Sequence, residues 1–307
     1  FGVPANTILV VVGLALLYFT VYPTIILLKS TFTVSISELS FGVMPGSYTG
    51  LWWKRLFVSG ETSITYFYKP LWNSIYMSFL ASIIAILYGG IVAFLITRTN
   101  VKAKKFLSTI FVFPYIMPSW TLATFWQNFF QNPSIGNGRN GMLYNLFRIS
   151  VPSGMVYGMI PCAIVLGLHY APFAYILIGG ILKNMDANLE EAATILQASR
   201  WKIIWKITVP IVMPAVLSTF LLVFASSMSA YAVPQYIGGG EKVLTTYMKQ
   251  FFAQGWQGQG YIFGVVMIVF GVGILLINQL LTGKRKNFTT VSGKSGQISY
   301  INLKGWK

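Results

Sequence analysis

The chain has 307 residues, of which 55% are hydrophobic and only 9% are charged, and its mean hydropathy is +0.66. Because a soluble domain carries about 25% charged residues, this composition excludes a soluble globular protein and indicates an integral membrane protein. The formal net charge of +16 does not indicate nucleic-acid binding, because the Lys and Arg residues lie in short segments beside apolar runs, where they set membrane topology.

Six apolar runs follow one another along the sequence, and each is long enough for a helix to cross roughly 30 Å of hydrocarbon. The predicted spans are residues 7–28, 72–96, 106–126, 157–182, 210–235 and 260–282. We therefore expect an all-α polytopic membrane protein with about six transmembrane helices. Its expected parts are the first span with the segment after it (1–71), a five-span core (72–283) that contains a polar loop (183–209), and a tail (284–307).

The basic residues are unevenly divided between the two sides of the membrane that these spans define. Residues 98–105, 183–206 and 284–307 hold 14 of the 22 Lys and Arg residues, and the segments on the other side hold 8. Basic residues accumulate in cytoplasmic loops. We therefore expect both termini and the polar loop to be cytoplasmic, and residues 30–71 and 127–156 to be extracytoplasmic.

The third predicted span holds two prolines four residues apart, Pro114 and Pro118. Each proline frees a backbone carbonyl from its helical hydrogen bond. Broken helices are tolerated in membranes where they are buried or line a cavity. The two prolines are therefore candidates for a pathway across the membrane, and helix-packing geometry is the alternative.

His169 is the only histidine and lies deep in the fourth predicted span, seven residues after the single cysteine, Cys162. Ionisable groups inside a membrane are candidates for function, so His169 is a candidate pathway residue. A neutral histidine that forms a hydrogen bond between helices is the alternative. One histidine without intramembrane acids does not make a metal site. No span carries the carboxylates of a proton relay, which argues against a proton-coupled carrier.

A short polar island separates the fourth and fifth spans and contains the only clustered acids of the chain. Asn188 is the expected N-cap of a helix over residues 188–199, with two acids in its first turn, where the helix dipole favours negative charge. The small alanines that follow would allow close approach to a partner. The candidate residues for partner binding are Glu190, Glu191, Ala192, Ala193, Gln197, Ala198, Ser199, Ile207 and Pro210.

This island resembles the cytoplasmic coupling loop of binding-protein-dependent ABC importer permeases. That loop reads Glu-Ala-Ala, three residues, Gly, nine residues, then Ile-x-Leu-Pro. The matching residues here are Glu191, Ala192, Ala193, Ile207 and Pro210. Gln197 stands where the family has Gly, and Val209 stands where it has Leu. Because the family Gly makes a turn that few residues tolerate, Gln197 either holds a different backbone there or continues the helix.

The resemblance implies that this short helix docks in a groove of an ATPase subunit and couples ATP hydrolysis to transport. A solvated loop helix without a partner is the alternative. Near the end of the fifth predicted span, the candidate pathway residues are Ser226, Ser229, Tyr231 and Gln235. Small residues also permit close helix approach, so packing is the alternative there.

The tail from Phe288 to Trp306 resembles the segment that joins the two six-span halves of ferric-iron-type permeases. The sequence leaves open whether the chain continues beyond Lys307 as a fused double permease, pairs with itself or pairs with a different chain. Gly293-Lys294 lacks the upstream glycine of a phosphate-binding loop. No nucleotide site is visible, so ATP and Mg²⁺ are expected on a partner ATPase.

The resemblance covers residues 70–307 and implies the permease subunit of a type I ABC importer in the bacterial inner membrane. Such a subunit is not itself an enzyme and has no catalytic residues, cofactor or metal site of its own. The implied partners are two ATPase subunits, a second permease subunit or fused half, an extracytoplasmic solute-binding protein and membrane lipid, but no nucleic acid. The expected substrate is ferric iron or another small polar solute, such as aminoethylphosphonate, a polyamine or a sugar. The alternative is an ATPase-independent secondary transporter or channel subunit.

Overall fold

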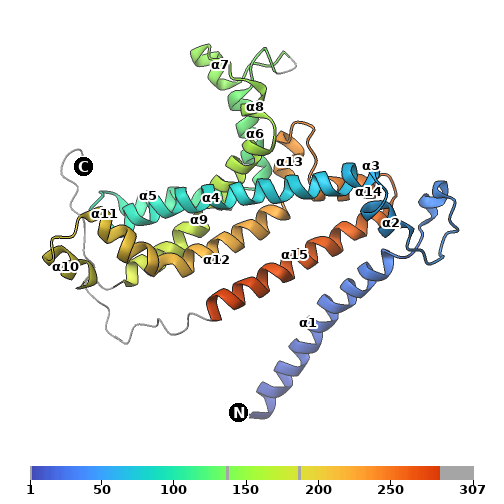
Figure 1. Ribbon diagram of the computed structural model, residues 1–307, viewed down its shortest axis with the longest axis horizontal. Helices are drawn as coiled ribbons and strands as arrows, with labels where there is room; N and C mark the ends of the chain where they lie inside the picture. Colours follow the sequence, from blue (N-terminus) through green and yellow to red (C-terminus); the bar gives the residue numbers. More distant parts are fainter. Residues whose placement is uncertain (1, 136–137, 186–187, 284–307) are drawn as a thin grey trace. The chain divides into compact units, whose positions relative to one another are not determined.

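The computed structural model describes residues 2–135, 138–185 and 188–283, and its elements are helices joined by short connections (Figure 1). Within those ranges the only β pairing is one isolated bridge between Thr33 and Tyr48. The predicted all-α class is therefore confirmed. The tail 284–307, whose sequence resembles an inter-half connector, lies outside the described residues.

The α-helices follow the apolar runs and the turns between them. They are α1 (Gly2–Ser30), α2 (Leu51–Phe57), α3 (Glu61–Ser63), α4 (Lys69–Arg98), α5 (Lys104–Ile116), α6 (Ser119–Phe130), α7 (Met142–Phe147), α8 (Ser153–Val156), α9 (Met159–Asn184), α10 (Asn188–Ile195), α11 (Arg200–Ile203), α12 (Val209–Met228), α13 (Ala232–Ile237), α14 (Leu244–Ala253) and α15 (Gln257–Gly283). A 3-10 turn covers Ile36–Phe41. Two π-helical turns, Ile64–Tyr68 and Ile204–Thr208, lead directly into α4 and α12 and lengthen them.

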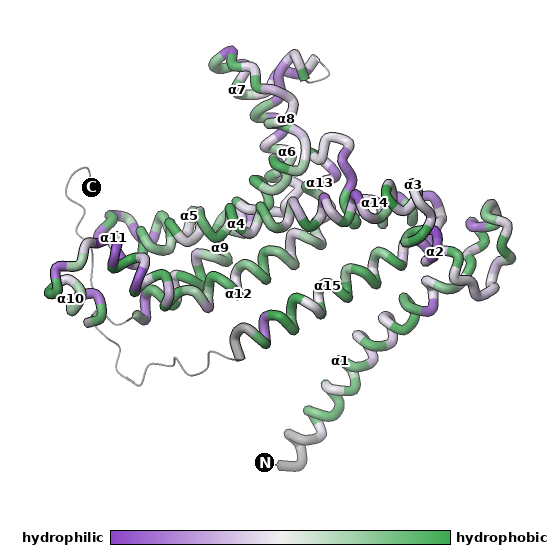
Figure 2. Tube along the Cα trace, viewed as in Figure 1, coloured by the Kyte–Doolittle hydropathy of each residue, from purple (hydrophilic) through white to green (hydrophobic). Residues whose placement is uncertain are grey.

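Five continuous helical segments are long and apolar enough to cross a membrane (Figure 2). They are Thr7–Ser30, Glu61–Arg98, Ser153–Asn184, Arg200–Met228 and Gln257–Leu280. The pair α5 and α6 makes a sixth span if the two helices are counted together. This agrees with a polytopic membrane protein of about six spans.

The predicted third span, 106–126, is two helices rather than one. Pro118 has no N–H and cannot bond the carbonyl of Pro114 one turn earlier, so α5 ends at Ile116. The axis then bends by 98° into α6, which begins at Ser119. With 13 residues, α5 is about 20 Å long and does not cross the hydrocarbon by itself.

The predicted fifth span, 210–235, is wrong at its far end. α12 ends at Met228, and α13 starts as a separate helix at Ala232. The Ser229 hydroxyl bonds two carbonyl oxygens of the last turn of α12, each at 3.1 Å. Pro234 cannot supply the N–H that a continuing helix needs at that point. The Ser229 hydroxyl competes for carbonyl oxygens of the last turn, and Pro234 has no N–H to donate, so the helix ends early.

The described residues form two compact units: those up to residue 72 with 242–270, and those of 73–241 with the described residues from 271 onward. The centre of the second unit is α9, against which α4, α5 and α12 pack. A Cβ added to Gly89 on α4 would meet the Ala174 Cβ at 2.7 Å, and a Cβ added to Gly167 on α9 would meet the Ile84 Cγ2 at 2.7 Å. These two glycines therefore let α4 and α9 approach closely. The buried apolar cluster beside them consists of Ala93, Ala174, Ile178, Leu182, Val212 and Ala215.

In the first unit, the buried carboxylate of Glu38 holds two helical starts together. Its Oε2 accepts a hydrogen bond from the Ser35 backbone N–H at 2.8 Å, which completes a capping box on the 3-10 turn. Its Oε1 accepts one from the Gly258 backbone N–H at 3.1 Å, in the first turn of α15. Burial raises the pKa of Glu38, and the backbone hydrogen bonds offset part of that rise.

All five acidic side chains of the described residues lie at helix starts. Glu61 opens α3, and Glu190 and Glu191 lie in the first turn of α10. Glu241 accepts a hydrogen bond from the Met159 backbone N–H at 3.2 Å, where α9 begins. Glu38 caps α15 in the same way. The positive end of the helix dipole favours negative charge, so this acid-poor chain places its carboxylates where helices begin.

Candidate functional site

The polar loop between α9 and α12 folds into the short helix α10, with the two acids in its first turn. Two details differ from the prediction. Asn188 is the first helical residue rather than the cap, and the positions before it, 186 and 187, lie outside the described residues. The helix also ends at Ile195 instead of continuing to residue 199.

Gln197 ends this helix by adopting the backbone conformation that glycine usually supplies. Its φ is +56°, in the left-handed region. Its N–H bonds the Thr194 carbonyl at 2.9 Å, and the next N–H, from Ala198, bonds the Ala193 carbonyl at 3.0 Å. This pair of bonds is a Schellman motif with Gln197 at its left-handed position. Both expected alternatives are therefore wrong, because Gln197 keeps a glycine-like turn and neither holds a different backbone nor continues the helix. Ser199 then caps α11 by accepting from the Lys202 N–H at 3.4 Å.

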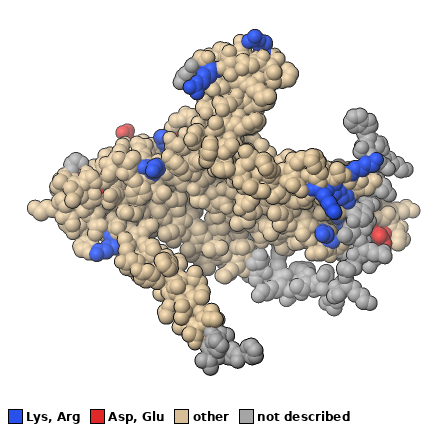
Figure 3. All heavy atoms as spheres, turned by 180° about the vertical axis from the view of Figure 1, so that it is seen from behind, with Lys and Arg blue, Asp and Glu red and all other residues tan. Residues whose placement is uncertain are grey.

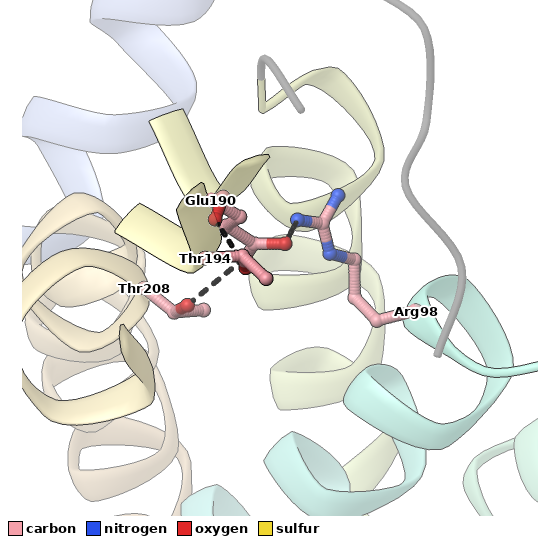
Figure 4. Close-up of polar contacts among 4 residues, drawn as sticks. All are labelled: Arg98, Glu190, Thr194 and Thr208. Atoms are coloured by element: carbon pink, nitrogen blue, oxygen red, sulfur yellow. Dashed lines mark hydrogen bonds and ion pairs between the residues drawn. The ribbon is translucent and has the colours of Figure 1, made fainter. Parts of the chain in front are cut away.

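The side chain of Glu190 turns inward from α10 (Figure 4). Its carboxylate forms an ion pair with the guanidinium of Arg98, the last residue of α4. It also accepts a hydrogen bond from the Thr208 hydroxyl at 3.1 Å, at the end of the π-helical turn before α12. Arg98 is 1% exposed and Glu190 is 15% exposed, so the pair is largely shielded from solvent. One carboxylate therefore ties α10 to both α4 and α12.

Glu191, the next residue along α10, is exposed, and so is Ala192. The two adjacent acids therefore face different surroundings: Glu190 faces the bundle and Glu191 faces outward. Large apolar side chains are also exposed on and near α10. They are Leu189, Ile195 (81% exposed), Leu196 (82%), Trp201 (71%) and Trp205 (65%).

The end of the motif lies where the loop joins the fifth span. Ile207 is in the π-helical turn, and Pro210 is in the first turn of α12, where a missing N–H is tolerated. π-helical turns insert an extra residue and are frequent at functional sites. Here the turn carries the buried Thr208, whose hydroxyl reaches Glu190.

Of the candidate pathway residues, the structure brings His169 and the third-span break together. His169 Nδ1 lies 2.9 Å from the carbonyl oxygen of Pro114. Because a carbonyl only accepts, Nδ1 carries the hydrogen. This carbonyl is the one that Pro118 leaves without a helical partner, so His169 supplies the missing bond. A role for His169 in a pathway stays a prediction.

The other candidate pathway residues lie around the connection between α12 and α13. Ser226 is half-buried, and Ser229, Tyr231 and Gln235 are exposed. The hydrogen bonds of Ser229 go to the carbonyl oxygens of its own helix. This region therefore presents polar groups at its surface, and its role as a pathway also stays a prediction.

Arg98 and Thr208 are site residues that the sequence patterns did not reveal. In the sequence, Arg98 resembles the other basic residues that set membrane topology. Thr208 lies inside the motif without any sign of a specific contact. The signal for Arg98 was its place directly after a long apolar run in a chain with only six acids. A guanidinium buried at a helix end needs a carboxylate, and the only acidic cluster is in the loop. In the part of the chain that the structure describes, no three His, Cys, Asp or Glu side chains form a group that could hold a metal ion.

Residues 85–287 match the model of the family described as "Binding-protein-dependent transport system inner membrane component". The putative ferric transport system permease protein FbpB 1 of Haemophilus influenzae is 25% identical over 290 residues, which are 92% of this chain and 42% of that protein. The ferric transport system permease protein FbpB of Actinobacillus pleuropneumoniae is 25% identical over 75% of this chain and 33% of its own length. The chain thus spans less than half the length of these two relatives.

The fold is also similar to solved structures. A chain of a bacterial ABC transporter involved in the import of the acidic polysaccharide alginate superposes with a TM-score of 0.66 and 17% identity, over 93% of this chain and 96% of that one.

Proposed function

The chain belongs to the family of binding-protein-dependent transport system inner membrane components, and from this we propose that it is the permease subunit of a type I ABC importer. The observation that carries the proposal is the arrangement of α10. Its inward acid, Glu190, is anchored to the bundle, and its outward residues are left exposed. A short helix that is fixed on one face and open on the other is suited to transmit force from a partner.

Coupling runs through Glu190 in this proposal. An ATPase subunit holds the exposed face of α10, with Glu191, Ala192 and the apolar side chains Ile195 and Leu196 in its groove. Movement of that groove then moves α10. The Glu190 carboxylate passes the displacement to α4 through Arg98 and to α12 through Thr208. A hydrogen-bonded ion pair transmits such a movement because separating its partners is costly when they are buried.

The proposed assembly contains two ATPase subunits on the side of α10, which hydrolyse ATP with Mg²⁺, and a solute-binding protein on the other side. A second permease unit, as a separate chain or a fused half, completes the pathway. The excess of basic residues on the α10 side supports a cytoplasmic position for that side and for both termini, in a bacterial inner membrane. The pathway is lined by the broken third span with His169 and by the α12–α13 connection.

Ferric iron is the proposed substrate, with another small polar solute as the broader class. The support is the sequence similarity to two ferric transport permeases, each 25% identical over most of this chain. The test is uptake by the assembled transporter in vesicles supplied with ATP and the solute-binding protein. Accumulation of ferric iron that requires ATP is expected; uptake that proceeds without ATP would contradict the importer.

Disulfide trapping tests the docking of α10 directly. Cys162, the only cysteine, is buried, so an introduced surface cysteine is the accessible thiol. Ala192→Cys should cross-link to an ATPase subunit that carries a cysteine in its docking groove. Ser229→Cys is the matched control, because it is exposed but lies at the opposite end of the fifth span. Equal cross-linking by both variants, or none by Ala192→Cys, contradicts the proposed coupling site.

A further inference from the structure

An apolar groove of about 680 Å³ lies between α4, α5, α6 and α9. Its volume is within the range of pockets that hold small ligands. The groove is lined by Tyr88, Val92, Leu95, Ile96, Val101, Leu107, Ile110, Phe111, Pro114, Leu122, Phe125, Trp126, Phe129, Phe130, Val165 and Leu168. The indole N–H of Trp126 is already bonded to the Met155 carbonyl at 3.2 Å. Such a lining offers dispersion contacts and very little for a polar solute.

The groove has the length of one membrane leaflet. Its wall on α4 runs from Tyr88 to Ile96, which is about 12 Å at the helical rise. One leaflet of hydrocarbon is roughly 15 Å deep, half of the core. α6 turns by 98° from α5, and its residues from Leu122 to Phe130 line the groove. Along α4 the groove is therefore long enough for most of one acyl chain.

The other end of the groove is basic. Val101 and Leu107 line it, and between them lie the exposed Lys102 and Lys105. Ala103, at φ +59°, makes the tight turn that begins α5 in this segment. Figure 3 shows Lys and Arg side chains gathered at this end of the larger unit. Basic clusters next to apolar surfaces between membrane helices attract anionic lipid head groups.

We propose that this groove binds one anionic phospholipid. An acyl chain lies between α4 and α5 and ends against α6, and the phosphate lies beside Lys102 and Lys105. The apolar lining of the groove suits the acyl chain. The positive charge at the mouth of the groove suits the phosphate. The groove shares Pro114 with the proposed pathway, and its wall on α4 ends two residues before Arg98, which is paired with Glu190.

Native mass spectrometry of the full chain tests this, with the protein purified in its natural complex and exchanged into nanodiscs of phosphatidylcholine and phosphatidylglycerol. One retained phosphatidylglycerol per chain is expected, in excess over phosphatidylcholine. Lys102→Gln and Lys105→Gln should each lower that preference by about fivefold, because each basic side chain near an anionic surface contributes that much. Lys183→Gln, which removes an exposed charge at the end of α9, is the matched control and should leave the preference unchanged.

Ile110→Trp fills the groove and should remove the retained lipid while the helical circular dichroism and the oligomeric state stay the same. Lipid retention by Ile110→Trp equal to that of the unaltered chain overturns the proposal. So does an equal preference in Lys102→Gln, Lys105→Gln and Lys183→Gln. If Ile110→Trp instead separates two copies of the chain without changing lipid content, the groove is a protein interface and the lipid site is wrong.

Discussion

Arg98 and Glu190 form a buried ion pair that joins the last residue of α4 to the first turn of α10. Within the described residues, Nη1 of Arg98 has no hydrogen-bond partner, so the guanidinium depends heavily on this one carboxylate. Glu190 has a second contact, with the Thr208 hydroxyl. The pair therefore fixes the orientation of α10, and its removal should have both structural and functional effects.

Glu190→Gln should lower the free energy of unfolding by about 3 kcal/mol, because it leaves a buried guanidinium without a countercharge. The double variant Arg98→Gln/Glu190→Gln should recover part of that loss, since no buried charge remains. Denaturant unfolding in detergent measures both. Glu191→Gln, one residue away and exposed, is the control and should change stability by less than about 0.5 kcal/mol. Equal losses for both single Gln variants would show that the ion pair does not hold α10.

Glu191→Lys should uncouple ATP hydrolysis from transport and leave stability and membrane insertion intact. The reason is that Glu191 is exposed on α10, on the face that the ATPase subunit is proposed to hold, so the charge reversal acts on the partner and not on the packing of the bundle. Transport and ATPase rates of the reconstituted transporter measure the effect. Glu61→Lys makes the same charge change at an exposed helix start in the first unit and should leave coupling unchanged. Full transport by Glu191→Lys would refute a coupling role for this face.

The helices were predictable because long apolar runs leave the chain few alternatives in a membrane, whereas their ends depend on local competition for backbone bonds. Pro118 frees a carbonyl that His169 then takes, and this splits the third span. Ser229 takes carbonyls of the last turn of α12, and this shortens the fifth span. The first bond joins residues far apart in the sequence, and the second depends on whether a side chain or the backbone bonds a carbonyl of the last turn. Hydropathy reveals neither bond.

The position of the candidate site was predictable from its motif, but the different roles of its two adjacent acids were not. The pattern groups Glu190 with Glu191, yet only Glu190 reaches Arg98 and Thr208. Consecutive helical residues point in directions about 100° apart, so adjacent acids face different surroundings. Which of the two faces the bundle depends on how α4, α9 and α12 pack, and that is tertiary information.

Gln197→Gly should raise the free energy of unfolding by about 1 kcal/mol and keep transport. Gln197 has a φ of +56°, and a side chain in the left-handed region costs about that much relative to glycine. Gln197→Val should lower stability further, because a β-branched residue tolerates this region least. Thermal unfolding of the two variants in the same detergent gives the comparison. If glycine is the destabilising replacement, the side chain of Gln197 makes a contact that outweighs the backbone strain.

Gly167→Ala should destabilise the chain by about 1–3 kcal/mol, because the added Cβ would lie 2.7 Å from Ile84 Cγ2 and 3.0 Å from the Ala81 carbonyl oxygen. Gly180→Ala on the same helix is the matched control, since nothing lies within 4 Å of its added Cβ. It should be neutral or stabilising by up to about 1 kcal/mol, the difference in helix propensity. Denaturant unfolding of the two variants separates packing from propensity, and equal effects would mean that α4 and α9 do not touch at Gly167.

The structure around Glu38 should weaken as the pH rises above the ordinary pKa of a glutamate. Burial raises the pKa of Glu38 in the folded protein above its usual value of 4.5, so the folded state holds the proton more tightly than the unfolded chain does. The contribution of Glu38 to the free energy of unfolding is fully present below pH 4.5 and is lost as the pH rises through the pKa of the folded state.

Hydrogen exchange measures this loss at the backbone N–H groups of Ser35 and Gly258, which bond the carboxylate. Their protection should fall with rising pH beyond the intrinsic acceleration of exchange, and in Glu38→Gln that additional fall should disappear. Glu61→Gln, at an exposed helix start in the same unit, should keep the pH dependence, and protection that rises with pH would show that the hydrogen bonds to the carboxylate outweigh its burial.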